Sequence, residues 1–223
     1  MTEQFADSSF EPAVRGFIHR PEAPGDACLV LTHGAGSNCQ APLLVALANV
    51  FAEAGSTVLR CNLPFRQCRL HGPPRPGDAE RDRQGLKHAV LSMRKMGLER
   101  VFLGGHSYGG RQATMLCAAE ADLVNGLLLS SYPLHPPGKP AQLRVQHFPR
   151  LQKNALFLHG TRDPFGTLEE MKAALRLVPA KTRLIEVEGA GHDLGFKGKS
   201  TNSELPGKAL AEFQELFAQT QSV

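Results

Sequence analysis

The most informative stretch of this sequence for its fold is Gly105-His106-Ser107-Tyr108-Gly109. It directly follows the apolar run 101–103, and residues 111–119 after it are rich in Ala, Leu, Met and Gln, which favour a helix. A short apolar run that ends at glycine is typical of a buried strand in a parallel sheet. The glycines on either side of Ser107 lack a Cβ and so permit a very tight turn. The stretch therefore predicts a strand, a sharp turn and a helix, with the Ser107 hydroxyl at the turn.

A serine in such a turn acts as a nucleophile only when a base takes its proton and an acid orients that base. Two residues later in the chain have the required order. Asp163 lies just beyond the apolar run 155–160, and His192 follows the alternating run 183–187. Because the carboxyl ends of parallel strands meet at one rim of a sheet, we expect Ser107, Asp163 and His192 to converge there as a catalytic triad.

Other acids and histidines have simpler expected roles. Asp193 is adjacent to His192 and cannot easily orient its ring, so we expect it to cap a loop, and we expect Asp122 to lie in a turn. His33 and His159 both precede glycine at strand ends and are expected to bind nearby backbone groups. His106 occupies a variable position of the turn and is expected to pack.

Acyl chemistry at a serine also requires two N–H groups that stabilise the oxyanion. The first is expected to be the backbone amide of Tyr108, the residue after the nucleophile, at the start of its helix. The second is expected from the loop after the apolar run 28–32. Ala35 is the predicted donor because small residues leave the backbone accessible, and Gly34 or Gly36 are the alternatives.

The strings Thr32-His33-Gly34-Ala35-Gly36 and Gly104-Gly105-His106-Ser107-Tyr108-Gly109-Gly110-Arg111 resemble the α/β-hydrolase superfamily. Within it, the chain is similar to testis-expressed hydrolase-like and dienelactone-hydrolase-like proteins, a group that includes a regulatory subunit of a histone-acetyltransferase complex. The similarity extends from about Val14 to the C-terminus. It implies an α/β-hydrolase fold and a Ser-Asp-His triad at the three residues already singled out. Dienelactone hydrolases have a Cys nucleophile where this chain has Ser107, so dienelactone is not the expected substrate.

Apolar runs and helical patterns alternate along the chain, which predicts an α/β fold with a mostly parallel sheet flanked by helices on both faces. Residues 1–12 are expected to be a flexible leader and residues 13–223 a single domain. The expected strands are 14–19 (at an edge), 27–32, 57–62, 101–105, 124–129, 155–160 and 183–187. The expected helices are 41–54, 79–96, 111–119, 168–177 and 203–219.

Two connections bear on the site. Residues 64–77 are dense in Pro and Arg and are expected to be irregular. The connection between Ser130 and Asn154 is short and leaves room for a flap and one brief helical segment near 142–147. We therefore expect no large cap domain and an open triad.

Three arginines, Arg66, Arg69 and Arg75, lie in the irregular loop on the rim where the triad is expected. A guanidinium group pairs well with a carboxylate. Arg66 and Arg69 are therefore predicted to bind anionic acyl substrates. The alternative is a solvated loop whose prolines limit its freedom.

Bulk properties exclude several classes. The chain has 223 residues, 42% of them hydrophobic and 21% charged, as in an ordinary soluble domain. No apolar run is long enough to span a membrane, and the acidic start of the chain lacks the apolar segment of a secretion signal. The five cysteines are an odd number without close pairs, which predicts reduced thiols and a cytoplasmic protein.

The same survey gives no sign of nucleic acid, metal or cofactor. A net charge of +4, with no Trp and two Tyr, provides neither a basic surface nor stacking groups for nucleic acid. No metal-ligand spacing and no phosphate-binding glycine loop occur. The expected partner is therefore a small-molecule acyl substrate, with no cofactor.

These observations predict a serine hydrolase, similar to carboxylesterases or thioesterases, that cleaves a small acyl ester through an acyl-enzyme. An acyltransferase with the same triad and a non-catalytic scaffold on the same fold are the alternatives. A scaffold has no chemical need for an intact triad, which favours the enzyme. The sequence leaves open the acyl chain, the choice between ester, thioester and lactone, and the oligomeric state.

Overall fold

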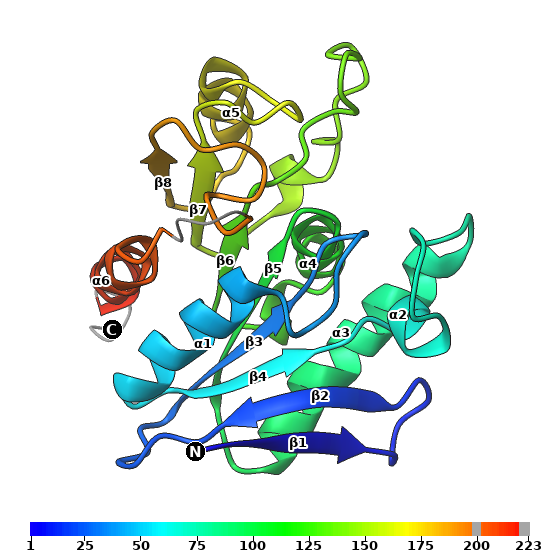
Figure 1. Cartoon of the computed structure of the whole chain (residues 1–223), viewed down its shortest axis with the longest axis vertical. Coiled ribbons are helices and arrows are strands. Elements are labelled where there is room, and N and C mark those ends of the chain that lie inside the picture. Colours follow the sequence, from blue (N-terminus) through cyan, green and yellow to red (C-terminus); the bar gives the residue numbers. More distant parts are fainter. Residues whose placement is uncertain (198–201, 219–223) are drawn as a thin grey trace.

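The computed structural model describes residues 1–197 and 202–218, which form one sheet with helices on both faces (Figure 1). The strands are β1 (Thr2–Asp7), β2 (Val14–His19), β3 (Ala27–Thr32), β4 (Thr57–Cys61), β5 (Arg100–His106), β6 (Gly126–Ser130), β7 (Ala155–Gly160) and β8 (Thr182–Val187). The α-helices are α1 (Pro42–Glu53), α2 (Pro64–Cys68), α3 (Asp78–Lys95), α4 (Tyr108–Ala119), α5 (Leu168–Leu175) and α6 (Leu205–Ala218). Two short 3-10 helices are η1 (Ala121–Leu123) and η2 (Phe148–Arg150).

The strand order in the sheet is β1-β2-β4-β3-β5-β6-β7-β8. The strands from β4 to β8 in this order are parallel, and β1 and β2 add an antiparallel pair at one edge. The strand order reverses at β3, whose two parallel neighbours are β4 and β5. In open α/β sheets, ligands bind in the crevice at such a reversal, which places a candidate site beyond β3 and β5.

Alternation along the strands divides the core into two layers. Cys28 and Val30 of β3 point to one face of the sheet, and Leu29 and Leu31 point to the other, because successive side chains of a strand lie on opposite faces. The first face packs against buried residues of α3, α4 and α5. The second face packs against α1 and α6. The predicted α/β fold with helices on both faces is confirmed.

The connection after β6 carries no cap domain. Residues 131–154 between β6 and β7 contain one regular element, the 3-10 helix η2. The prediction of a fold without a large cap is therefore confirmed. The brief helical segment expected near 142–147 is absent, and the helical turn comes directly after it at η2.

Two other segments differ from the expectations. The expected flexible leader contains β1, which pairs with β2 along its whole length and places Phe5 against the core, so β2 is not an edge strand. The expected irregular stretch 64–77 begins with α2, where Pro64 occupies the first turn and the Asp82 carboxylate accepts a hydrogen bond from the Phe65 amide. Both elements depend on partners outside their own segment, which local patterns do not reveal.

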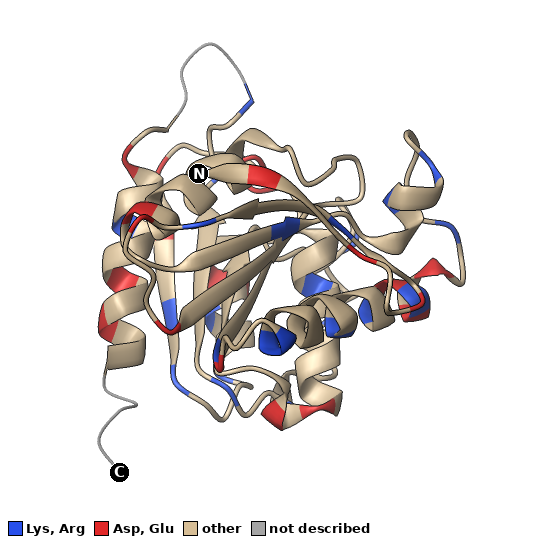
Figure 2. Cartoon of the chain, turned by 90° about the horizontal axis from the view of Figure 1, so that it is seen from below, with Lys and Arg blue, Asp and Glu red and all other residues tan. Residues whose placement is uncertain are grey.

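Charges are arranged along α3 as a helix dipole favours. Asp78 and Glu80 lie in the first turn, and Arg94 and Lys95 lie in the last, with further basic residues along the helix (Figure 2). Within residues 1–197 and 202–218, none of the helices has the length and hydropathy needed to cross a bilayer.

Candidate active site

The segments that follow β3, β5, β7 and β8 meet at one rim of the sheet. Ser107 directly follows β5, Asp163 lies three residues after β7, and His192 lies five residues after β8. The structure thus brings together the three residues that the sequence predicted to converge.

Ser107 adopts a strained backbone conformation, with φ 52° and ψ −116°, between the end of β5 and the start of α4. Glycine is required on both sides of this turn. A Cβ at Gly105 would lie 2.6 Å from the Gly110 nitrogen, and a Cβ at Gly109 would lie 2.5 Å from the His33 carbonyl oxygen. The close approach of β3, β5 and α4 therefore depends on the absence of these side chains, as the sequence predicted.

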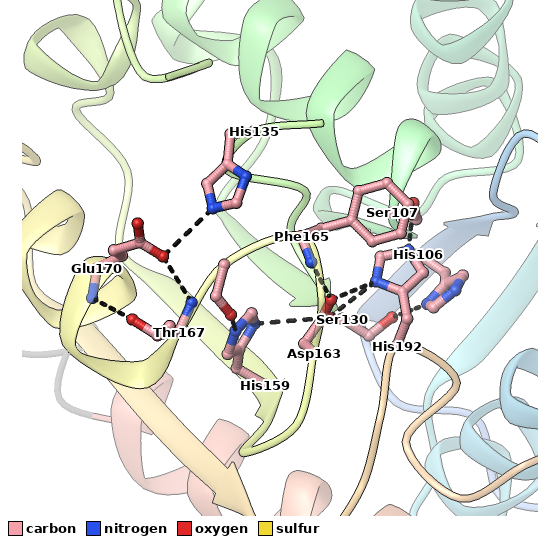
Figure 3. Close-up of polar contacts among 11 residues, drawn as sticks. His106, Ser107, Ser130, His135, His159, Asp163, Phe165, Thr167, Glu170 and His192 are labelled. Carbon is pink, nitrogen blue, oxygen red and sulfur yellow. Dashed lines mark hydrogen bonds and ion pairs between the residues drawn. The ribbon is translucent and has the colours of Figure 1, made fainter. Parts of the chain in front are cut away.

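The three side chains form a continuous hydrogen-bonded chain (Figure 3). The Asp163 carboxylate lies 2.8 Å (Oδ2) and 3.0 Å (Oδ1) from His192 Nδ1. The distance from His192 Nε2 to Ser107 Oγ is 2.7 Å. Because a carboxylate only accepts hydrogen bonds, Nδ1 carries the ring proton, and Nε2 is left to accept the hydrogen of the Ser107 hydroxyl. This is the arrangement in which a histidine acts as a base toward serine.

Asp163 and His192 are held firmly in place. The Asp163 side chain is fully buried, and its Oδ1 also accepts a hydrogen bond from the Phe165 amide at 2.9 Å. The Phe165 ring packs against the His192 imidazole, with 4.2 Å between ring centroids and 32° between the ring planes. His159 is buried beside Asp163 and bonds the Gly166 carbonyl through Nε2, which is the backbone role the sequence predicted for it.

The loop after β3 is fixed by His33, which lies in the core. Its Nδ1 donates to the Gly34 carbonyl at 2.9 Å, and its Nε2 accepts from the Leu63 amide at 3.1 Å. Burial lowers the pKa of His33 to about 4, so the ring is neutral near pH 7. This confirms the expected backbone role of His33. Over the described part of the chain, the amides of Ala35 and Tyr108 have no hydrogen-bond partner, so both remain available as donors.

His106 and Asp193 occupy the surroundings of the base. His106 packs with its ring centroid 5.2 Å from that of His192, and burial lowers the pKa of His106 to about 3. The two carboxylate oxygens of Asp193 accept hydrogen bonds from the amides of Gly195 and Lys197. Packing for His106 and a loop cap for Asp193 are thus confirmed.

The structure does not bring Arg66 and Arg69 into contact with a substrate site, and this corrects the expectation for them. The buried Arg66 guanidinium donates to the carbonyl oxygens of Ser37, Ala35, Gly72 and Arg69, at 2.8, 2.9, 2.9 and 3.1 Å. Arg69 pairs with Asp78. Since these donors are already occupied within the protein, Arg66 ties the loop after β3 to the segment after β4 instead of facing solvent.

Sequence reasoning missed the apolar side chains that line the cleft at Ser107. A cleft of about 280 Å³ opens at Ser107 between the loop after β3 and the loop that carries His192. Phe165 lies two residues after Asp163 and Phe196 four residues after His192, and this proximity in sequence was the available signal for both. Nothing in the sequence near the predicted triad indicated that the start of α1 would line the cleft.

Comparison with known proteins places the chain in a family. The model of the alpha/beta hydrolase domain family matches residues 25–219, so the chain belongs to this family. The resemblance to the α/β-hydrolase superfamily is thereby confirmed.

Solved structures share the fold at low sequence identity. A dienelactone hydrolase from Anabaena variabilis is 20% identical, with a TM-score of 0.75 over 97% of this chain and 98% of that one. An α/β serine hydrolase homologue from Coxiella burnetii is 17% identical, with a TM-score of 0.69 over 99% and 97% of the two chains. A serine hydrolase without a lid from Xanthomonas campestris is 15% identical, with a TM-score of 0.74 over 97% and 95%.

Proposed function

We propose that this protein is a serine hydrolase that cleaves small acyl esters or thioesters. One observation carries the proposal, namely the unbroken path from the Asp163 carboxylate through His192 to Ser107 Oγ, with contacts of 2.8 and 2.7 Å. Ser107 is a poor nucleophile on its own, and a base already within hydrogen-bond distance of its hydroxyl removes that limitation.

The geometry supports a two-step reaction. Ser107 Oγ attacks the acyl carbon while its proton passes to His192 Nε2, and the resulting oxyanion accepts hydrogen bonds from the Tyr108 and Ala35 amides. His192 then protonates the leaving oxygen or sulfur, and the acyl group remains on Ser107. In the second step His192 takes a proton from water, the hydroxide attacks the acyl carbon, and the released Ser107 Oγ regains its proton. Asp163 remains ionised and stabilises the imidazolium in both steps.

The structural neighbours favour this assignment. They include proteins described as serine hydrolases and a dienelactone hydrolase, and one of them is described as lacking a lid. The short connection over residues 131–154 supports an equally open site here. A Ser at position 107 favours ester and thioester cleavage over the dienelactone chemistry of Cys enzymes.

A fluorophosphonate probe and p-nitrophenyl acetate test the proposal. We expect the wild-type protein to be labelled and to hydrolyse the acetate, and Ser107→Ala to lose both. Thr114→Ser serves as a control, because it keeps a hydroxyl on the same helix, away from the turn. A folded wild-type protein that neither labels nor hydrolyses the acetate would instead be a scaffold on this fold.

A further inference from the structure

The cleft at Ser107 is open to solvent on one side and lined mainly by apolar groups. Ser107, His106 and His192 line it together with the loop after β3. The remaining lining includes six apolar side chains, namely Ala41, Pro42, Leu43, Leu44, Phe165 and Phe196. Leu43 and Leu44 come from the first turn of α1, and both are anchored in the core layer between the sheet and α6. This part of the cleft is therefore a preformed apolar surface next to the reacting hydroxyl.

Charged groups contribute little to the interior of the cleft. Asp193 and Lys197 are the charged side chains among its described lining, and the Asp193 carboxylate is occupied by backbone amides. Lys197 is exposed, so its ammonium group remains hydrated. Burial lowers the pKa of His106 to about 3 and keeps that ring neutral. A charged substrate group would lose its hydration here without gaining a buried partner.

The size of the cleft sets a limit on its occupant. A volume of about 280 Å³ holds about nine groups of the size of a water molecule or a methylene, at about 30 Å³ each. A bulky lipid exceeds this volume, and an acetyl group alone leaves most of it unfilled. A single straight chain of intermediate length matches it.

We propose that the cleft binds a straight, uncharged hydrocarbon chain of about six to nine carbon atoms attached to the scissile ester. This proposal rests on the proposed function, since it takes Ser107 as the nucleophile. The hydrocarbon chain belongs either to the acyl group or to the alcohol of the substrate, and the same apolar cleft would bind it in both cases.

Two alanines provide a matched pair of variants. Ala41 and Ala46 are both partly buried and pack against the same core layer, but only Ala41 lines the cleft. Ala41→Phe adds a ring that narrows the cleft, whereas Ala46→Phe adds the same ring elsewhere. Thermal unfolding of both variants checks that each remains folded.

The experiment measures kcat/KM for two series of substrates. One series is p-nitrophenyl esters from acetate to dodecanoate, and the other is acetates of straight-chain alcohols from ethyl to dodecyl. Each buried methylene is expected to raise kcat/KM about fourfold, up to about eight carbons, in the series that carries the chain into the cleft. Beyond that length the values level off or fall. Ala41→Phe is expected to move the maximum to chains about two to four carbons shorter, and Ala46→Phe is expected to leave it in place.

The outcomes separate this proposal from the proposed function. Flat profiles in both series, or equal displacement of the maximum by both alanine variants, overturn the assignment of the cleft. If the probe still labels Ser107 and acetate is still hydrolysed, the serine hydrolase proposal stands without it. A steep acyl series places the chain on the acyl side, and a steep alcohol series places it on the alcohol side.

Discussion

At the scale of single residues, Arg66 shows how a charge can support a site that it does not enter. Among the residues that the structure describes, its guanidinium group donates only to backbone carbonyls, and two of these belong to Ala35 and Ser37 in the loop expected to supply an oxyanion donor. The other two belong to Arg69 and Gly72. A planar group with five donors suits this task, because it joins two loops in a fixed relative position.

Replacing Arg66 therefore tests how the loop that holds Ala35 is positioned, and not whether Arg66 binds a charged substrate. We expect Arg66→Lys to lower kcat about tenfold or more, because an ammonium group cannot bridge both loops and the Ala35 amide loses its fixed position. KM is expected to change little, and neutral and carboxylated esters are expected to be affected equally. The measurement is steady-state kinetics with one ester of each kind.

Arg69→Met is the matched control, because the Arg69 side chain pairs with Asp78 while only its backbone contacts Arg66. It is expected to leave kcat within about threefold, as for a partly exposed ion pair at the surface. A selective rise in KM for the carboxylated ester in Arg66→Lys would restore the role in substrate binding that the sequence suggested.

The residues of the site differed in how far the sequence could predict them. Ser107 and Asp163 follow apolar runs and His192 follows an alternating run, and parallel strands bring such positions to one rim. The sequence shows the cluster of arginines that contains Arg66 as clearly as it shows the triad residues. The partners of Arg66, however, are carbonyl oxygens in two loops. Backbone acceptors occur at every position of a chain, so the sequence holds no signal for that pairing.

At the scale of elements, the turn at Ser107 depends on close contact between the loop after β3 and the start of α4. A Cβ at Gly109 would lie 2.5 Å from the His33 carbonyl oxygen. We expect Gly109→Ala to destabilise the fold by about 1–3 kcal/mol and to remove most of the esterase activity, because the loop that holds Ala35 must shift. Urea unfolding and p-nitrophenyl acetate hydrolysis measure the two effects.

Gly207→Ala is the control at this scale. Gly207 lies within α6, and a Cβ there meets no atom within 4 Å. Alanine is expected to stabilise the protein by up to about 1 kcal/mol, since glycine is unfavourable inside a helix. A Gly109→Ala variant as stable and active as wild type would show that the contact at the turn can relax.

The elements that the sequence predicted share a local origin. The strands from β3 to β8 are apolar or alternating runs, and the long helices have apolar stripes or favourable composition. β1 and α2 lack such patterns. β1 forms because β2 offers it a complete set of backbone partners, and α2 forms where Asp82 receives the Phe65 amide. These contacts join each element to another segment of the chain, so the pattern within the element could not predict it.

At the scale of the whole molecule, four neutral histidines are distributed through the interior. Burial lowers the pKa of His19, His33 and His147 to about 4 and that of His106 to about 3. His19 Nε2 accepts a hydrogen bond from Arg60 Nε at 2.8 Å, and His33 Nε2 accepts from a backbone amide. Protonation of these rings would abolish both bonds, so the fold requires the neutral form.

This arrangement predicts a loss of stability in mild acid. In the unfolded chain each histidine has a pKa near 6.5, so between about pH 6.5 and 4 the unfolded state binds more protons than the folded one. The free energy of unfolding therefore falls as the pH falls through this range, by about 1–2 kcal/mol for each histidine between pH 7.5 and 5.0. A carboxylate such as Asp7, whose pKa is lowered to about 2, loses its contribution only at lower pH.

Urea unfolding at pH 7.5 and 5.0 measures this loss of stability. A substitution can remove the contribution of one histidine to it. The His147 ring is buried and bonds Thr114 Oγ1 at 2.8 Å, a contact that a glutamine amide can reproduce without titrating. We expect His147→Gln to reduce the difference between the two pH values by about 1 kcal/mol. His71→Gln replaces an exposed histidine and is expected to leave the difference unchanged. Equal stability of the wild-type protein at both pH values would mean that the interior accommodates the imidazolium forms. Protonation of the buried histidines would then not destabilise the fold.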